Sequence, residues 1–170
     1  MHKLIALVGP ESCGKTTLAL ELAAHLQACL VHEYAREYFS EQSPLKAYTS
    51  DDVLKIAKAQ WCREQQAIEG RKYPIVLDTD LLVLDIWCLF KYGQTPAWIQ
   101  EKLDKQPDRA YLLMSPDIPW RADPLRENPH NRVEIFKLYE NALKQGQREY
   151  VCIRGTQAER LEQALLFIGE

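Results

Sequence analysis

The sequence contains no apolar run of about 18 residues, the length at which a membrane-spanning helix is predicted. Its first residues also lack the basic segment, the long apolar stretch and the small-residue cleavage site of a signal peptide. The net charge is only −3, and the basic residues are dispersed, which argues against nucleic acid as the main ligand. We therefore expect neither a membrane nor a nucleic acid among the partners of this protein.

The cysteine and histidine residues show no metal-site spacing. The chain has five cysteines and four histidines, all scattered, and no two cysteines lie close in sequence. This pattern argues against a metal cluster and favours a reduced, cytoplasmic protein. The sequence also lacks internal repeats and low-complexity linkers, so its 170 residues are expected to form one domain, 1–170.

What the sequence does contain is a phosphate-binding loop near its start. The residues from Gly9 to Thr16 read G-P-E-S-C-G-K-T, which fits G-x-x-x-x-G-K-[ST] between an apolar run and a helical pattern. Gly9 and Gly14 let the backbone turn its amides toward an anion, and the helix N-terminus adds partial positive charge. We expect Lys15 to reach the β- and γ-phosphates of ATP and the Thr16 hydroxyl to bind Mg²⁺.

The other loop residues are assigned to the nucleotide as well, namely Glu11, Ser12, Cys13 and Thr17. Thr17 either contacts the α-phosphate or is an ordinary residue of the first helical turn. Cys13 is either a thiol whose modification blocks ATP or a small residue whose side chain points away from it. We favour the second interpretation for Cys13.

Apolar strands alternate with helical segments along the rest of the chain, which predicts βαβ units and a parallel sheet. Strands are expected at 3–8, 28–33, 73–78, 110–114 and 150–154. Helices are expected at 15–27, 51–69, 81–90, 95–103 and 128–145, with a last helix capped by Thr156. The result is a three-layer α/β domain, in which ligands bind at the carboxyl ends of the strands.

Carboxylates follow the second and third strands at that edge. Asp78 ends an apolar strand, where phosphate-loop enzymes place an acid near Mg²⁺, although it could instead cap the following helix. Asp80 is either that cap or a substrate ligand. Glu33 and Asp78 are comparable candidates for the group that activates an acceptor hydroxyl. The alternative for Glu33 is a surface ion pair with Arg36.

A proline-rich segment with three arginines follows the fourth strand. It spans about 116–132 and resembles a lid that closes over phosphates. Arginine supplies fork-shaped donors for the charge that develops in phosphoryl transfer, and Arg126 and Arg132 are preferred over Arg121 for this catalytic role. The alternative is a solvated basic loop. After the fifth strand, Gly155-Thr156 could let the adenine ring approach the backbone, and it also serves as a helix cap.

Four segments in this order resemble the nicotinamide riboside kinase domain of NadR-type NAD-salvage proteins. They are residues 9–17, 33–37, 78–80 and 111–120. The resemblance implies a P-loop kinase fold with a five-stranded parallel sheet in the order 2-3-1-4-5. It also implies transfer of phosphate from ATP to the 5′-hydroxyl of nicotinamide riboside, with Mg²⁺, to give nicotinamide mononucleotide and ADP.

The resemblance further implies which residues surround the small-molecule riboside. It places Glu33, Arg36, Asp78 and Asp80 around the riboside and offers Tyr34 and Trp120 as flanks for the pyridinium ring. Aromatic faces and carboxylates both favour such a cation, which fits the residue types independently.

Two departures from the NadR pattern leave alternatives open. NadR-type proteins usually carry an adenylyltransferase domain before the kinase, whereas here Met1 directly precedes the first strand, so the kinase domain is expected to stand alone. Cys13 replaces a common serine. A stand-alone relative could phosphorylate another nucleoside or small alcohol, and the formation of a homo-oligomer is left open. A nucleotide-dependent switch or ATPase is the remaining alternative, although no N-K-x-D element occurs and no length remains for a further helical domain.

Overall fold

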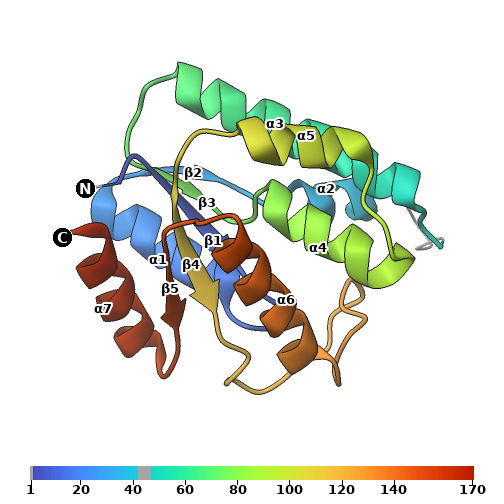
Figure 1. The fold of residues 1–170 in the computed structure, drawn as a ribbon. Helices are drawn as coiled ribbons and strands as arrows, with labels where there is room; N and C mark the ends of the chain where they lie inside the picture. The colour runs from blue at the N-terminus through green and yellow to red at the C-terminus, as the bar shows by residue number, and fades with distance from the viewer. Residues whose placement is uncertain (1, 42–46) are drawn as a thin grey trace.

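A computed structural model describes residues 2–41 and 47–170 of the chain, which form a parallel sheet between two layers of helices (Figure 1). The strands are β1 (Leu4–Val8), β2 (Cys29–Val31), β3 (Ile75–Leu77), β4 (Ala110–Met114) and β5 (Tyr150–Ile153). The sheet order is β2-β3-β1-β4-β5, and every pair is parallel, as predicted. Met1, on which the expectation of a stand-alone domain rested, lies outside the described residues.

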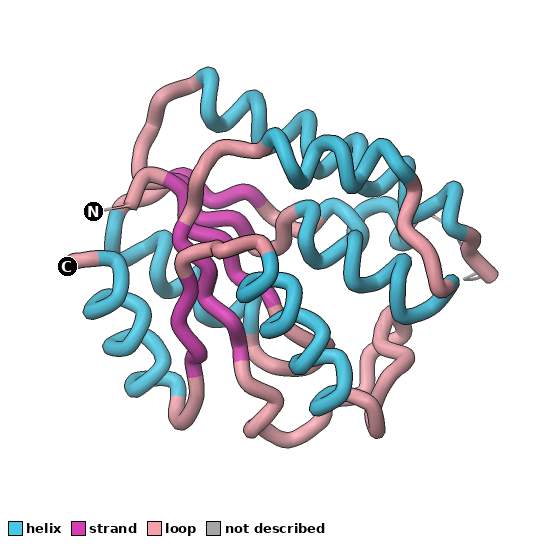
Figure 2. Tube along the Cα trace, viewed as in Figure 1, coloured by secondary structure: helices cyan, strands magenta, loops and turns pink. Residues whose placement is uncertain are grey.

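Helices cover both faces of the sheet (Figure 2). They are α1 (Lys15–Leu26), α2 (Tyr34–Ser40), α3 (Ser50–Glu69), α4 (Leu81–Tyr92), α5 (Ala97–Lys105), α6 (Arg132–Gln145) and α7 (Gln157–Ile168). The side chains of α1 and α7 pack on one face, and those of α4 and α6 pack on the other. No helix in the described part of the chain combines the length and the apolar character that crossing a membrane requires.

The central strand shows why the sheet lies inside. All five residues of β1 are buried, because a parallel strand with helices on both faces is apolar along its whole length. Leu4, Ala6 and Val8 join the core on the α4–α6 side. Ile5 and Leu7 join the core on the α1–α7 side. A third apolar cluster, beyond the sheet, packs α2 against α3, α4 and α5.

Most elements lie within about two residues of their predicted bounds, and α2 and the start of α6 differ by more. The helix α2 was not expected, because only Ala35 and Phe39 of its seven residues are buried and the apolar signal is therefore short. Helix α6 begins at Arg132 rather than at Asn128. The backbone N–H of Asn128 donates instead to the carboxylate of Glu11, at 2.8 Å, which keeps this part of the chain in a loop.

Candidate functional site

The phosphate-binding loop joins β1 to α1 at the carboxyl edge of the sheet. Gly9 and Gly14 have φ angles of 139° and 86°, in the region that favours glycine. A Cβ on Gly9 would lie 2.7 Å from the carbonyl oxygen of Met114 in β4, so a larger residue does not fit there. The Lys15 ammonium donates hydrogen bonds to the carbonyl oxygens of Gly9 and Pro10, both at 2.8 Å. The predicted strand, glycine loop and helix are therefore present, with the lysine side chain folded over the loop.

The Cys13 thiol points into the core between α1 and α7. Its side chain is buried, and Sγ donates a hydrogen bond to the Pro10 carbonyl oxygen at 2.8 Å. Burial raises the pKa of the Cys13 thiol above its ordinary value of 9.0, although Lys15 and Arg160 oppose this rise. A protonated, buried thiol reacts poorly. Cys13 is also among the residues that line the cavity beside the loop, so the interpretation in which its side chain points away from the nucleotide stays a prediction.

The turn after β3 carries Asp78 and Asp80, whose carboxylates point in different directions. Thr79, between them, has a φ angle of 104°, which is unusual for a residue other than glycine. Asp78 is 2% exposed and accepts a hydrogen bond from the Thr16 hydroxyl. Gln60 of α3 holds the turn by donating to the Thr79 carbonyl oxygen at 3.3 Å. The strained turn therefore directs Asp78 toward the phosphate-binding loop.

Asp80 lies in the core and not at the site. Its Oδ1 accepts a hydrogen bond from the Leu82 N–H at 3.0 Å, which caps α4. Its Oδ2 accepts from the Tyr111 hydroxyl at 3.0 Å and lies 3.4 Å from Arg109 Nη1. Arg109 also pairs with Glu64 at 2.8 Å. The expectation that Asp80 binds the substrate is therefore corrected, since both of its oxygens serve the helix cap and a buried ion network.

Thr16 and Asp78 form a donor pair suited to Mg²⁺. The Oδ1 atom of Asp78 is buried and has no hydrogen-bond partner. Burial raises the pKa of the Asp78 carboxyl group above 3.8, while Thr16 and Lys15 oppose the rise. A hydroxyl and one carboxylate suffice for a cation that keeps phosphate oxygens and water as its other ligands. Within residues 2–41 and 47–170, no cluster of three or more acidic, cysteine or histidine side chains offers a different metal site.

Glu33 stands at the end of β2, where α2 begins. Its Oε2 lies 3.5 Å from Arg36 Nε, so the predicted ion pair forms. Glu33 also lines a cavity beside the phosphate-binding loop, which we call the main cavity. Burial raises the pKa of the Glu33 carboxyl group above 4.5, and the nearby Asp78 raises it further, while Lys15 opposes the rise. Arg36 makes a second ion pair with Asp123, at 3.1 Å. Glu33 is therefore a carboxyl group close to both the loop and the cavity.

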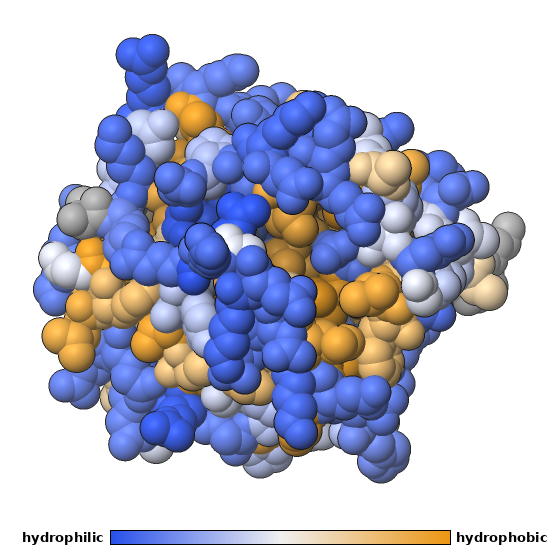
Figure 3. All heavy atoms as spheres, in the orientation of Figure 1, coloured by the Kyte–Doolittle hydropathy of each residue, from blue (hydrophilic) through white to orange (hydrophobic). Residues whose placement is uncertain are grey.

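The main cavity lies between the phosphate-binding loop, α2, α4, α6 and the segment 125–128, and measures about 260 Å³. Its apolar wall consists of Phe39, Val83, Ile86, Trp87, Phe90 and Leu125. Apolar residues also gather over α4 beside the mostly hydrophilic surface of α6 on the face shown in Figure 3. Sequence reasoning did not single out these aromatic residues, because in an apolar helix they cannot be told from core residues.

Tyr34 and Trp120, which the family resemblance offers as flanks for the pyridinium ring, do not line the main cavity. Tyr34 packs under the guanidinium of Arg63, 4.6 Å from its ring centre, and its backbone N–H donates to Gln60. The Trp120 ring lies 5.8 Å from the guanidinium of Arg132. Neither residue is among those that line the main cavity. The aromatic lining of this cavity comes instead from Phe39 of α2, Trp87 and Phe90 of α4, and Tyr139 of α6.

The segment 116–132 contains no helix or strand before Arg132, where α6 begins, and it is bound to the phosphate-binding loop. The Glu11 carboxylate accepts hydrogen bonds from the backbone N–H groups of Glu127 and Asn128, at 3.0 and 2.8 Å. The Ser12 hydroxyl accepts from the Arg121 N–H at 2.9 Å. The side chains of Glu11 and Ser12 thus bind the segment 116–132.

Two arginines of this segment reach the loop. Arg126 Nη1 donates to the Arg121 carbonyl oxygen at 2.6 Å and lies 3.5 Å from the Ser12 hydroxyl. Arg126 lines the main cavity and also a second hollow beside it. Arg132 Nη1 donates to the carbonyl oxygens of Ser12 and Ile118, at 3.2 and 2.9 Å. Arg126 is therefore placed to contact a ligand, whereas Arg132 binds loop backbone.

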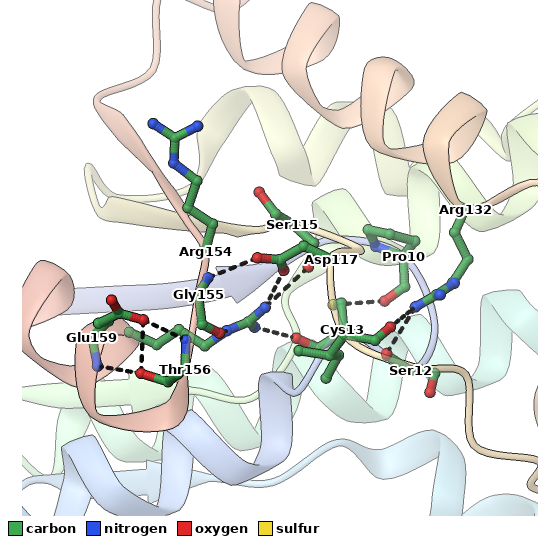
Figure 4. A network of polar contacts seen from close by, with 12 residues as sticks. Pro10, Ser12, Cys13, Ser115, Asp117, Arg132, Arg154, Gly155, Thr156 and Glu159 are labelled. Atoms are coloured by element: carbon green, nitrogen blue, oxygen red, sulfur yellow. Dashed lines mark hydrogen bonds and ion pairs between the residues drawn. The ribbon is translucent and has the colours of Figure 1, made fainter.

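The second hollow lies on the other side of the loop and measures about 430 Å³. It is lined by Ser12, Gly14, Thr17, Leu18, Glu21, Ile118, Pro119, Arg121, Arg126, Gly155, Thr156, Gln157 and Arg160. Thr156 caps α7, and its backbone N–H donates to Glu159 Oε2 at 2.7 Å (Figure 4). Gly155 and Thr156 thus lie where a nucleotide base could rest, and the helix-cap role is present as well. Arg160 was missed by sequence reasoning, because nothing local marks an arginine in α7.

The chain is similar to known proteins over most of its length. Residues 4–160 match a family model described as "AAA domain". The chain is 26% identical over 159 residues to "Trifunctional NAD biosynthesis/regulator protein NadR" of Salmonella typhimurium. The match covers 89% of this chain and 38% of that protein, so the chain spans less than two fifths of the curated relative.

Solved structures share the fold at lower sequence identity. The crystal structure of NadR protein in complex with NR superposes with a TM-score of 0.77 at 18% identity, covering 98% of this chain and 50% of that one. A deoxyadenosine kinase from M. mycoides gives a TM-score of 0.65 at 14% identity, covering 97% of this chain and 98% of that one. This chain belongs to the AAA-domain family, and it has the P-loop kinase fold of the half of NadR that it matches.

Proposed function

We propose that this protein transfers the γ-phosphate of ATP to the 5′-hydroxyl of nicotinamide riboside, giving nicotinamide mononucleotide and ADP. The observation that carries the proposal is the position of the phosphate-binding loop, which borders the main cavity on one side and the second hollow on the other. A donor nucleotide in the second hollow would extend its phosphates across the loop. An acceptor in the main cavity would then face the terminal phosphate.

The donor side has the charges that phosphoryl transfer requires. Lys15 and the amides of the loop lie at the start of α1, where the helix N-terminus favours anions. Arg126 reaches the same place from the segment 116–132 and lines both hollows. Because charge spreads over the equatorial phosphate oxygens during transfer, two cationic groups at this point stabilise the transition state more than the ground state.

Thr16 and Asp78 would hold the Mg²⁺ ion. The buried, unpartnered Oδ1 of Asp78 and the neighbouring Thr16 hydroxyl supply the hard oxygen ligands that this cation prefers. The ion, when bound, would neutralise part of the charge on the phosphate groups. Asp78 also stays a candidate for the group that accepts the hydroxyl proton.

Glu33 and the aromatic wall would bind and activate the riboside. The Glu33 carboxylate lies near Lys15 and at the cavity surface, so it can accept a proton from an acceptor hydroxyl close to the terminal phosphate. Phe39, Trp87 and Phe90 offer flat apolar surfaces to a base. A pyridinium cation gains from both aromatic faces and carboxylates. The likeness to NadR, which was crystallised with NR, supports this choice of base.

A kinase for another nucleoside is the second candidate. It is favoured by the positions of Tyr34, Asp80 and Trp120, none of which lines the main cavity. The riboside contacts implied by the family resemblance therefore do not all exist in this chain. A planar purine or pyrimidine base would pack against the same aromatic wall.

A substrate panel distinguishes these candidates. The protein is incubated with ATP, Mg²⁺ and one nucleoside at a time, and the phosphorylated product is identified by mass spectrometry. We expect nicotinamide riboside to give the highest kcat/KM. If another nucleoside turns over and nicotinamide riboside gives no mononucleotide, the specific proposal fails. ATP hydrolysis that is equally fast without any acceptor would favour an ATPase or switch instead.

A further inference from the structure

The guanidinium of Arg160 in α7 joins three loops at the carboxyl edge of the sheet. Only 5% of the residue is exposed. Nη1 donates to the Cys13 carbonyl oxygen at 2.7 Å, in the loop after β1. Nη2 lies 3.4 Å from the Ser115 carbonyl oxygen, in the loop after β4. Nε donates to the Gly155 carbonyl oxygen at 2.8 Å, in the loop after β5.

Asp117 completes this network from the loop after β4, as Figure 4 shows. Its Oδ1 forms a close ion pair with Arg160 Nη2, and its Oδ2 accepts a hydrogen bond from the Gly155 N–H at 2.7 Å. Gly155 is therefore held at both its N–H and its carbonyl group. Its φ angle of 93° suits glycine, and a Cβ there would lie 2.5 Å from Glu159 Oε2.

The contact with Cys13 determines how one peptide group of the phosphate-binding loop is turned. In a planar trans peptide the C=O and the following N–H point in opposite directions. Because the Cys13 carbonyl is held by Arg160, the Gly14 N–H must point away from α7. Gly14 borders both hollows, so this amide is held on the ligand side of the loop.

The network serves the donor side of the site. Gly14, Gly155 and Arg160 line the second hollow, whereas Gly155 and Arg160 do not line the main cavity. All three guanidinium nitrogens of Arg160 already have protein partners, which leaves the side chain little capacity to bind a ligand directly. Its effect on a ligand would therefore pass through the loops that it holds.

We propose that Arg160, held by Asp117, is a positioning residue for the donor nucleotide. It fixes the orientation of the Cys13–Gly14 peptide for phosphate binding and holds Gly155 in the wall of the second hollow. The assignment of the second hollow to the donor rests on the proposed function. The riboside side of the site is not part of this role.

The test replaces the forked guanidinium while keeping its charge. A lysine carries its donors on a single nitrogen and cannot reach the Cys13, Ser115 and Gly155 carbonyl oxygens together, so Arg160→Lys is expected to weaken ADP binding at least about tenfold, measured by calorimetry. KM for ATP should rise by a similar factor, while KM for the riboside changes less than about twofold. Thermal denaturation without nucleotide reports whether the variant is folded.

A second variant keeps the test decisive if Arg160→Lys does not fold. Asp117→Asn keeps an acceptor for the Gly155 N–H but removes the charge that holds Arg160, so ADP binding should weaken by a smaller factor. Arg154→Lys is the matched control, because Arg154 is exposed and its side chain points away from the network in Figure 4. We expect this control to bind ADP as the wild type does.

Two results would overturn the inference. The first is an Arg160→Lys variant that is folded and binds ADP as tightly as the wild type. The second is an equal loss of ADP and riboside binding together with a lower melting temperature, which is the signature of a structural role alone. If the wild type binds ADP but phosphorylates no riboside, the proposed function fails while the role of Arg160 in donor binding can still be measured.

Discussion

At the scale of single residues, the site depends on charges that are held out of water near the phosphate-binding loop. Lys15 supplies the positive charge, and its ammonium lies against two loop carbonyl oxygens at 2.8 Å. Asp78 and Glu33 supply carboxyl groups whose pKa values are raised by burial. Groups with such shifted pKa values gather at functional sites more often than elsewhere.

Replacing Lys15 by alanine should remove turnover while leaving the fold intact. The Lys15 ammonium makes its hydrogen bonds to residues of the loop, so the core keeps its packing. We expect kcat to fall by about 10³-fold or more, because the terminal phosphate loses its main cationic contact. Steady-state kinetics and circular dichroism measure the two effects. A variant with rates like those of the wild type would contradict the role given to the loop.

Asp78→Asn should separate activity from stability. Turnover is expected to fall at least about 10²-fold, because the metal position or the base is lost. The folded state favours the protonated form of Asp78, since its pKa is raised. This carboxyl group therefore stabilises the fold at low pH, and that contribution is lost as the pH rises through the folded pKa. At pH 7 the free energy of unfolding of Asp78→Asn, measured in urea, should be equal to or higher than that of the wild type.

The pH profile tests Glu33. Both Glu33 and Asp78 must be ionised to work, so kcat/KM should fall as the pH drops through pKa values above the ordinary 4.5 and 3.8. Burial and the nearby Asp78 raise the pKa of Glu33, while Lys15, Arg36 and Arg126 oppose the rise. In Glu33→Gln the acid limb should therefore move to lower pH, and kcat should fall by about 10²-fold or more. An acid limb at an unchanged pH would exclude Glu33 from catalysis.

Residues whose role follows from local sequence were predictable, and those whose role follows from distant contacts were not. The phosphate-binding function of the loop follows from the spacing of Gly9, Gly14 and Lys15, so the loop can be predicted from the sequence. Asp80 has the same residue type and nearly the same position as Asp78. Only the strained Thr79 between them sends one carboxylate to the loop and the other into the core.

At the scale of secondary-structure elements, a buried ion network joins α3, α4 and β4. Arg109, beside β4, pairs with Glu64 of α3 at 2.8 Å and lies 3.4 Å from Asp80, the cap of α4. The side chains of all three residues are 2% exposed or less. The network thus fixes the start of α4, directly after the turn that carries Asp78.

Removing Arg109 should destabilise the whole domain. Arg109→Met leaves two buried carboxylates without a cation, which costs about 3–5 kcal/mol in comparable buried pairs. Urea denaturation monitored by fluorescence measures this difference. Lys105→Met is the matched control, because its exposed ion pair with Glu101 contributes little to stability. A loss of less than about 1 kcal/mol for Arg109→Met would contradict the importance of this network.

Long elements with a regular apolar pattern were predictable at this scale, and short ones were not. Helix α3, whose periodicity is clear over many turns, was expected within one residue of its observed ends. Helix α2 has only two buried positions, so its sequence resembles a loop. The start of α6 depends on Glu11, far away in sequence, which holds Asn128 outside the helix.

At the scale of the whole molecule, the alternation of strands and helices was enough to predict a three-layer domain with a parallel sheet between helices. The strand order came from the resemblance of four motifs to a known family, and the structure has that order. The sequence did not predict how the segment 116–132 contacts both the loop and α2. In that arrangement the Glu127 N–H donates to Glu11 in the loop, and Asp123 pairs with Arg36 in α2.

This arrangement places the main cavity and the second hollow beside one phosphate-binding loop, and the proposed function assigns the acceptor to the first and the donor to the second. Ligands that bind the folded state should therefore stabilise the entire domain by mass action. The central claim is that the loop delivers the terminal phosphate of a nucleotide to an alcohol held in the cavity.

The most direct test follows the phosphate itself. ATP with a heavy-oxygen label in its γ-phosphate is incubated with nicotinamide riboside, Mg²⁺ and the protein, and the products are analysed by mass spectrometry. We predict a labelled phosphate ester on the 5′-oxygen of the riboside, and none with Lys15→Ala. Label found only in free inorganic phosphate would contradict the account.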